Sequence, residues 1–190
     1  MKLLRSFLIA IVLVVLTITV YLAQYLGAFK SVDISEAEKG PLKLLYKEHT
    51  GAYHKVVGVI EEVEAWAKQK NIDCSESFGE YLDNPNVTEE NRLRSRGGCV
   101  VKEFPTTALP EGFLTREIPV RKYVVALFDG SPGIGPLKVY PKVENYMKEH
   151  RLAIDGPVLE IYVIHSEKAM TTTYLFPAVE TDAVPGPAVR

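Results

Sequence analysis

The stretch GPVLEIYV, residues 156–163, has the composition of a β-strand except at one position. Its β-branched and bulky apolar residues are the types that fill a half-buried strand. Glu160 stands among them, although burying an unpaired carboxylate costs several kcal/mol. Because side chains alternate across a strand, Glu160 and Tyr162 are expected on one face, with Leu159 and Ile161 on the other, under a helix. The alternative is a solvated glutamate paired with a nearby lysine or arginine.

An internal repeat extends this observation over most of the chain. A shift of 80 residues lays VEAWAKQKNI (63–72) over VENYMKEHRL (143–152), and it lays Glu80 over Glu160. A glycine turn precedes the helical segment in both halves, and two apolar runs follow it. Shared spacing over several elements is typical of a duplicated unit. The sequence therefore predicts an α+β fold of two β-α-β-β halves around a central groove, with the two glutamates at pseudo-symmetric positions.

Both helical segments carry a single apolar stripe, because apolar residues recur every three to four positions. In the first helix the stripe comprises Val56, Val59 or Ile60, Val63, and Trp66 or Ala67. In the second it comprises Leu137, Tyr140, Val143, and Tyr146 or Met147. Each helix is expected to bury this stripe on an antiparallel sheet with one covered and one free face. Trp66 and Tyr146 are the predicted core anchors of the two helices.

The N-terminal segment has the character of a membrane-spanning helix. Residues 7–22 carry no charge, and the apolar span approaches the ~20 residues needed to cross a bilayer core. This favours an uncleaved signal anchor, residues 1–29, that contacts lipid along 7–26, over a cleaved signal peptide, whose apolar region is usually about 7–15 residues. Lys2 and Arg5 favour an N-terminus on the inner side. We expect a single-pass protein with its domain on the periplasmic side of a bacterial inner membrane, or alternatively in the endoplasmic reticulum membrane.

The rest of the chain divides by composition. Residues 30–40 are polar and are expected to form a linker. The folded domain is predicted over 41–178, with halves at about 41–104 and 115–178. The last segment, 179–190, contains two prolines and few residues that could pack, so a loose tail is expected.

Several classes of function receive no support from the composition. The net charge is −2 and no run of lysine and arginine is present, so nucleic acid is not an expected partner. The four histidines are scattered and neither cysteine lies in a CxxC motif, so no metal or cofactor is expected. Cys74 and Cys99 fall on predicted neighbouring strands, where either two free thiols or a disulfide is possible.

Several segments along the chain carry a resemblance to known families. They are LYKEHTGAY (45–53), YLDNPNV (81–87), RGGCVV (96–101), SPGIGPLKVYPKVENYMKEHRL (131–152) and LEIYV (159–163), together with Cys74. These segments resemble the gyrase-inhibitory-protein-like (GyrI-like) small-molecule-binding domain, which is also the effector module of multidrug-sensing transcription regulators. A narrower resemblance is to the membrane-anchored testis-expressed autophagy receptor family of the endoplasmic reticulum. The resemblance implies two β-α-β-β halves around a groove in which Glu160 is the carboxylate.

A groove that combines aromatic rings with a desolvated carboxylate suits an apolar cation. The leading prediction is a membrane-anchored small-molecule-binding module. One alternative is a hydrolase in which Glu160 acts as acid or base with help from Tyr162 or Tyr46. Another is a membrane tether or receptor, although the tail lacks an aromatic-x-x-aliphatic binding motif with acidic neighbours; no protein partner is assigned. The residues expected to bind the ligand are Glu160, Tyr162, Tyr46, Tyr53, Glu80 and Trp66.

Overall fold

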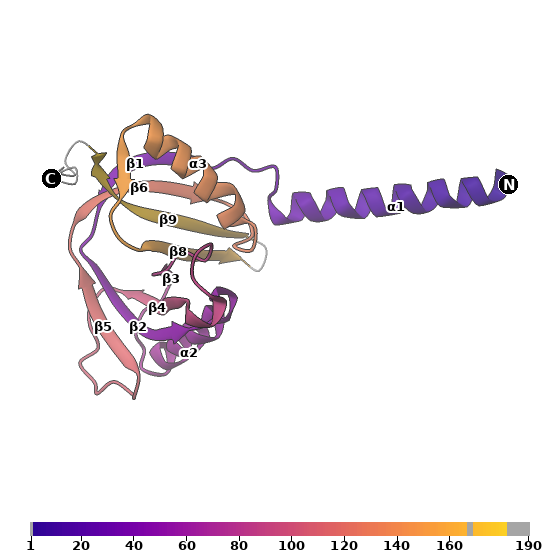
Figure 1. Ribbon diagram of the computed structural model, residues 1–190. Coiled ribbons are helices and arrows are strands. Elements are labelled where there is room, and N and C mark those ends of the chain that lie inside the picture. Colours follow the sequence, from indigo (N-terminus) through magenta and orange to yellow (C-terminus); the bar gives the residue numbers. More distant parts are fainter. Residues whose placement is uncertain (1, 167–168, 182–190) are drawn as a thin grey trace.

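The computed structural model describes residues 2–166 and 169–181 and shows an α+β domain from which one long helix projects (Figure 1). The helices are α1 (Lys2–Leu26), α2 (Val56–Gln69) and α3 (Gly135–Glu149). The strands are β1 (Asp33–Lys39), β2 (Leu42–Thr50), β3 (Glu76–Tyr81), β4 (Arg94–Val101), β5 (Phe113–Ile118), β6 (Arg121–Phe128), β7 (Leu152–Ile154), β8 (Val158–Ser166) and β9 (Ala169–Glu180).

The strands form one antiparallel sheet in the order β1-β6-β9-β8-β3-β4-β2-β5, and β7 adds to the end of β9. The predicted β-α-β-β halves are confirmed as β2-α2-β3-β4 and β6-α3-β8-β9. They meet at the pairing of β3 with β8 in the middle of the sheet. The two outer strands cross over, because β1 pairs with β6 of the second half and β5 pairs with β2 of the first.

The linker predicted over 30–40 is wrong for most of its length. Residues 33–39 form β1, whose backbone pairs with β6 from Asp33 to Lys39. Only Ile34 and Ala37 of this strand pack against the core, so an edge position explains its polar sequence. The predicted tail begins two residues too early, because β9 continues to Glu180, and residues 182–190 lie outside the described residues.

Helix α2 buries the stripe that its periodicity predicts, whereas in α3 the buried stripe matches the prediction only in its second half. The buried residues are Val56, Ile60, Val63 and Ala67 in α2, and Gly135, Val139, Val143 and Met147 in α3. Ala67 and Met147 therefore occupy the core positions expected for Trp66 and Tyr146, which are only partly buried at the edges of the clusters. Leu137 was predicted in the stripe and is instead 78% exposed.

The two faces of the sheet are both covered, but differently. We call the side under α2 and α3 the helix face and the other side the opposite face. Val158 packs with Val139 of α3 on the helix face, whereas Leu159 and Ile161 belong to a cluster made of strand residues on the opposite face. The expectation that Leu159 and Ile161 lie under a helix is thus wrong. Apolar alternation could not reveal this, because β8 is central and buried on both faces.

Cys74 and Cys99 form a disulfide with a Cα–Cα distance of 5.3 Å, so the free-thiol state is not the one in the structure. The bond ties the entry of β3 to β4 in the first half, where Cys99 pairs with Ser77. It therefore fixes the strand that borders the second half.

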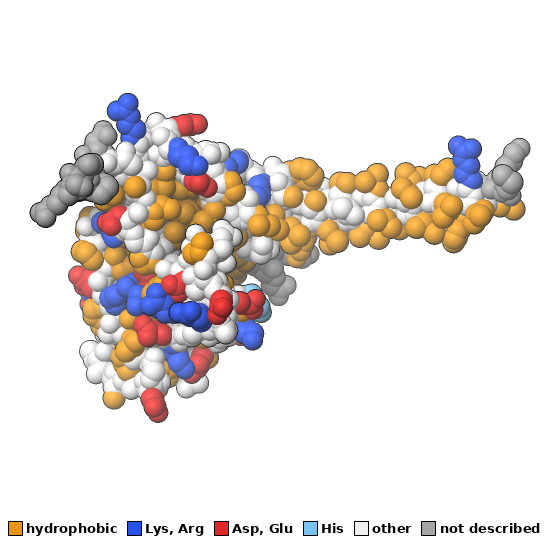
Figure 2. Space-filling view, viewed as in Figure 1, with side chains coloured by type: hydrophobic (Ala, Val, Ile, Leu, Met, Phe, Trp, Pro, Cys, Tyr) orange, Lys and Arg blue, Asp and Glu red, His pale blue; other side chains and the backbone are white. Residues whose placement is uncertain are grey.

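Helix α1 differs from the rest of the fold because its apolar side chains face outward along its length (Figure 2). Residues Leu3–Leu26 have a mean hydropathy of 2.7 and are not buried against the domain. By length and composition, this is one helix that could cross a membrane.

Candidate ligand-binding site

Glu160 lies at the centre of the sheet, on the helix face. Its strand β8 pairs on one side with β3, where Gly79 is directly opposite, and on the other with β9, where Tyr174 is opposite. The side chain is not solvated, since Glu160 is only 3% exposed. The alternative of a solvated glutamate is therefore wrong.

Only hydroxyl groups hydrogen-bond to the Glu160 carboxylate among the described residues. Tyr140 of α3 donates to Oε1 at 3.1 Å, and Tyr162 donates to Oε2 at 3.0 Å. The Tyr81 hydroxyl lies 3.0 Å from that of Tyr162 and extends the network. No lysine or arginine in the described part of the chain forms an ion pair with this carboxylate.

This environment disfavours the charged carboxylate. Burial raises the pKa of Glu160 to about 7, although the hydrogen bonds from Tyr162 and Tyr140 act to lower it. Burial also raises the pKa values of Tyr162, Tyr140 and Tyr81, and the nearby Glu160 charge adds to the effect, so these hydroxyls stay protonated. The site therefore holds an acid near its midpoint at neutral pH among neutral donors.

Gly79 makes room for this network. A Cβ atom built on Gly79 would lie 3.0 Å from the Tyr81 hydroxyl and 3.1 Å from the Tyr162 hydroxyl. Such contacts are tighter than most real Cβ contacts. The two phenols can therefore meet above β3 because this position carries no side chain.

Glu80 is equally buried, at 3% exposure, but it lies on the opposite face. Arg96 donates to Oε2 at 2.9 Å and Arg116 donates to Oε1 at 2.6 Å, so the charge is paired twice. Both guanidinium groups lie over the ring of Tyr46, at 5.6 and 6.0 Å. Glu80 and Tyr46 thus form a separate charge cluster that does not share a groove with Glu160.

A one-residue difference between the halves explains why the predicted equivalence of the two glutamates fails. The offset of 80 holds at the helix ends, where Ala67 matches Met147 (147 − 67 = 80). Across the central strand pair, however, Gly79 faces Glu160 (160 − 79 = 81) and Glu80 faces Leu159. A slip of one residue moves a side chain to the other face of a sheet.

The remaining predicted site residues divide between the site and the core. Tyr162 contacts Glu160, and Tyr53 borders the network, with its ring 4.8 Å from that of Tyr81. Trp66 packs against Phe113, with ring centroids 5.2 Å apart, in the cluster under α2 and away from the site.

Sequence reasoning missed three of the phenols that surround Glu160: Tyr140, Tyr81 and Tyr174. Tyr140 was assigned only to the apolar stripe of α3, whereas its hydroxyl reaches the carboxylate. A tyrosine in a stripe that faces a buried acid is the signal that could have identified it.

A cleft of about 450 Å³ reaches this network from the side of α2. Tyr162 forms part of its wall and hydrogen-bonds Glu160, whereas Glu160 itself does not line the cleft. Its lining residues are Glu64, Lys68, Ile72, Asp73, Cys74, Ser75, Ser77, Tyr162 and Ile164.

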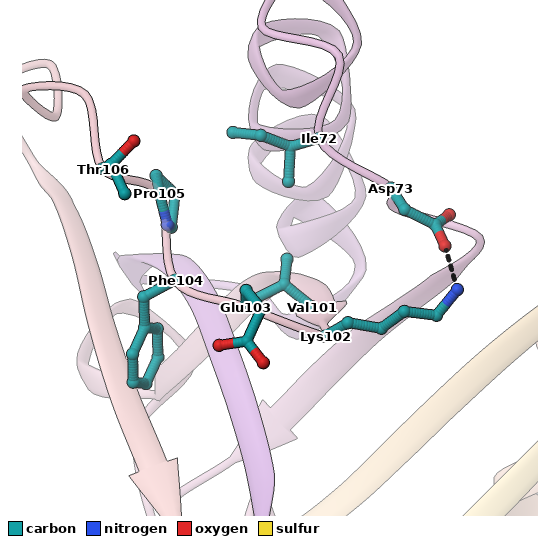
Figure 3. Close-up of a pocket in the computed structure, with 8 residues that line it drawn as sticks. All are labelled: Ile72, Asp73, Val101, Lys102, Glu103, Phe104, Pro105 and Thr106. Carbon is teal, nitrogen blue, oxygen red and sulfur yellow. Dashed lines mark hydrogen bonds and ion pairs between the residues drawn. The ribbon is translucent and has the colours of Figure 1, made fainter.

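A smaller cleft of about 290 Å³ lies beyond the end of β4, near Phe104 (Figure 3). Figure 3 shows the ion pair of its edge residues Lys102 and Asp73, whose atoms are 2.9 Å apart. Both of these side chains are exposed, and the cleft contains no buried charge. It therefore does not have the properties of the Glu160 site.

A family model described as "GyrI-like small molecule binding domain" matches residues 33–177. The chain belongs to this family. The match includes β1, which agrees with the strand that replaces the predicted linker.

Individual relatives agree with this assignment. A DNA gyrase inhibitor of Pectobacterium carotovorum subsp. carotovorum (strain PC1) is 32% identical over 75 residues, which cover 38% of this chain. The chain spans about half the length of that curated relative, 48%. The narrower likeness to autophagy receptors of the endoplasmic reticulum is not supported.

Two solved structures share the fold. The EcmrR C-terminal domain has a TM-score of 0.62 at 11% identity and covers 78% of this chain and 98% of its own. SAV2435 bound to tetraphenylphosphonium has a TM-score of 0.53 at 13% identity and covers 77% of this chain and 94% of its own. At these identities the likeness concerns the fold alone.

Proposed function

We propose that this protein is a membrane-anchored binding module for lipophilic cations and that Glu160 is the charge that pairs with the ligand. The observation that carries the proposal is a carboxylate with 3% exposure that has hydroxyl partners and no cationic partner among the described residues. A cationic ligand would supply the missing charge, and the phenol rings would contribute cation–π attraction.

The comparison with Glu80 sharpens this argument. Both glutamates are 3% exposed, but Glu80 has two arginine partners within 3 Å and gains nothing from a further cation. The same fold therefore contains one buried acid with its charge balanced and one without. The unbalanced one accepts a hydrogen bond from Tyr162, which lines the cleft.

The ligand class follows from the walls of the site. Aromatic rings and a carboxylate select a cation with apolar substituents, because a strongly hydrated cation would lose its water without replacement. Tetraphenylphosphonium, the molecule bound to SAV2435, has this chemistry and is a suitable test ligand. A ligand in the cleft meets Tyr162, because this residue lines the cleft and hydrogen-bonds Glu160.

Membrane attachment through α1 is part of the proposal. The 24 residues from Leu3 to Leu26 span about 36 Å as a helix, which exceeds the ~30 Å of a bilayer core. The disulfide between Cys74 and Cys99 supports a domain on an oxidising side of that membrane. Labelling of an introduced surface cysteine by an impermeant maleimide in whole cells tests on which side of the membrane the domain lies. A cysteine that is protected from the reagent would contradict a domain on the oxidising side.

Equilibrium dialysis of tetraphenylphosphonium against the full chain in lipid nanodiscs tests the binding function. Glu160→Gln keeps the shape and removes the charge, so it should weaken binding by about 2 kcal/mol or more, roughly thirtyfold. The neutral triphenylphosphine oxide should bind both proteins alike. Glu144→Gln on the outer surface of α3 is the matched control and should bind like the wild type.

Two acids line the cleft itself, Glu64 and Asp73, and Asp73 is paired with Lys102. Glu64 lines the outer cleft and is a rival for the same role. If Glu64→Gln weakens binding and Glu160→Gln does not, the cation stays in the outer cleft and the proposal is wrong.

A hydrolase is the second candidate, because a carboxyl group with a pKa of about 7 can serve as general acid or base at neutral pH. In that case Glu160→Gln would abolish turnover of a reactive substrate while leaving the binding of neutral molecules unchanged.

A further inference from the structure

The membrane helix ends in a fixed turn and not in a flexible joint. Gly27 has a φ of +84°, its N–H donates to Gln24 at 3.1 Å, and the N–H of Ala28 donates to Ala23 at 2.8 Å. These are the two hydrogen bonds of a Schellman C-cap, in which glycine adopts the left-handed conformation. β1 begins at Asp33, so few residues separate the helix from the sheet.

The domain holds this helix end through α3 and the loop before it. Lys138 of α3 donates from Nζ to the carbonyl oxygens of Gly27 at 3.2 Å, of Ala28 at 2.6 Å, and of Lys30. The N–H of Ser131 donates to the carbonyl of Leu26 at 3.0 Å. A lysine ammonium at the negative end of a helix dipole is favourable, so these bonds fix the last turn of α1 against the domain.

Two glycines allow the close approach at this junction. A Cβ on Gly27 would lie 3.1 Å from the Cα of Gly130, and a Cβ on Gly130 would lie 2.3 Å from the ring of Phe128. The helix end and the loop are therefore in direct backbone contact. A junction packed in this way determines which end of the domain faces the membrane.

The end of the domain that α1 leaves is also the end that carries the outer part of the cleft. Thr171 of β9 donates to Asp129, next to Gly130, at 2.6 Å. The residue before Thr171 in β9, Met170, pairs with Ile164 of β8. Ile164 lines the cleft together with Tyr162. Figure 1 shows the tip of β8 pointing to the side from which α1 projects.

Exposed apolar side chains gather at this same end. Ile164 is 62% exposed, Leu137 near the start of α3 is 78% exposed, and Phe29 after α1 is also exposed. A lipid interface would cover such residues, and insertion of α1 in the bilayer would bring them next to the bilayer surface.

We infer that the cleft mouth at Ile164 rests on the bilayer surface and that the lipophilic cation reaches Glu160 from the lipid phase. This inference rests on the proposed binding function and specifies where the ligand comes from. A cation with apolar substituents concentrates at a membrane interface, so a mouth held there meets it at a higher local concentration than in water.

Depth-dependent quenching tests the position of the mouth. A fluorescent label is attached to Ile164→Cys, or to Ile154→Cys as the matched control, in the full chain in nanodiscs; Cys74 and Cys99 are already bonded to each other. Ile154 is 53% exposed and lies in β7, where it pairs with Ala178 near the far end of β9. Lipids with a spin label on the headgroup should quench the label at 164 several-fold more than the label at 154. Equal quenching at the two positions would overturn the inference.

The junction provides an independent test. Lys138→Met removes the ammonium that holds α1, and Lys142→Met, one turn later on an exposed position, is the control. Lys138→Met should reduce quenching at 164 and slow both association and dissociation of tetraphenylphosphonium, leaving Kd unchanged because only the route is altered. If Lys138→Met reduces quenching at 164 but leaves the association and dissociation rates of tetraphenylphosphonium unchanged, the inference that the cation arrives from the lipid phase is wrong. Strong quenching at 164 with no tetraphenylphosphonium binding at all would refute the proposed function and not the position of the mouth.

Discussion

Replacing Glu160 by glutamine is expected to change how the stability of the protein depends on pH. Burial raises the pKa of this carboxyl from 4.5 to about 7, a shift of about 2.5 pH units. At 1.36 kcal/mol per unit, ionisation of Glu160 destabilises the folded state by about 3 kcal/mol. The variant keeps the shape of the side chain and has no group that ionises.

The sign of the effect follows from the direction of the shift. Between pH 4.5 and about 7 the folded protein retains a proton on Glu160 that the unfolded chain has lost. Folding stability therefore falls as pH rises through this range, by about 3 kcal/mol in total, and stays reduced above it. Ion-paired acids with lowered pKa values, such as Asp83 beside Arg94 and Glu36 beside Lys122, act in the opposite direction at lower pH and are common to both proteins.

Urea unfolding of the full chain in detergent, followed by Trp66 fluorescence, measures this difference. The chain has a single tryptophan, which is partly buried against Phe113 at the edge of the cluster under α2, away from the substituted residue. The free energy of unfolding of the wild type should fall relative to Glu160→Gln between about pH 5 and pH 8. Parallel curves for the two proteins would mean that Glu160 ionises as in water, and the reasoning from its burial would be wrong.

Three further outcomes are expected. Tetraphenylphosphonium should bind the wild type more tightly as pH rises to about 7, by up to tenfold per pH unit below the pKa, whereas Glu160→Gln should show no such slope in equilibrium dialysis. Glu80→Gln should lower the free energy of unfolding by about 1–3 kcal/mol in urea, because it removes the buried carboxylate that the two partly exposed arginines share, although Arg96 keeps its ion pair with Glu48; the folded fraction should keep its ligand affinity. Alkylation of the unreduced protein should label neither Cys74 nor Cys99, and replacing both by serine should cost about 2–4 kcal/mol; two labelled cysteines in mass spectrometry would contradict the bond.

The sequence allowed prediction of those parts of the fold in which burial repeats at a fixed spacing. The stripes of α2 and α3 recur because both helices cover the same kind of sheet, so the two β-α-β-β halves could be recognised. β1 could not, because an edge strand with only Ile34 and Ala37 against the core has the composition of a linker. Its partner β6 lies in the other half of the chain, and local sequence does not reveal that pairing.

The sequence indicated Glu160 and its strand neighbour Tyr162, but not the phenols that reach the carboxylate from other elements. A carboxylate in an apolar strand is an anomaly that the sequence shows directly, whereas Tyr140 and Tyr81 reach it from elements distant in sequence. The assignment of Glu80 depended on the register between the two halves. The second half has one more residue than the first between the end of its helix and the facing position of its central strand, and this extra residue changes the register. Neither the composition nor the spacing within one half indicates where the extra residue lies.

The positions of the two glutamates give a physical reason why only Glu80 has its charge balanced by arginines. A buried carboxylate is tolerated when arginines neutralise it, as they do for Glu80 on the opposite face. On the helix face the neighbouring positions are occupied by Gly79, Tyr81 and Tyr162, whose groups donate hydrogen bonds or leave space but carry no positive charge. Glu160 therefore remains an acid that is stable when protonated and that becomes stable as an anion only when a cation from outside the chain lies against it. A ligand that supplies this charge stabilises the folded protein by its own binding, so tetraphenylphosphonium should raise the unfolding midpoint of the wild type most at the pH where Glu160 is ionised.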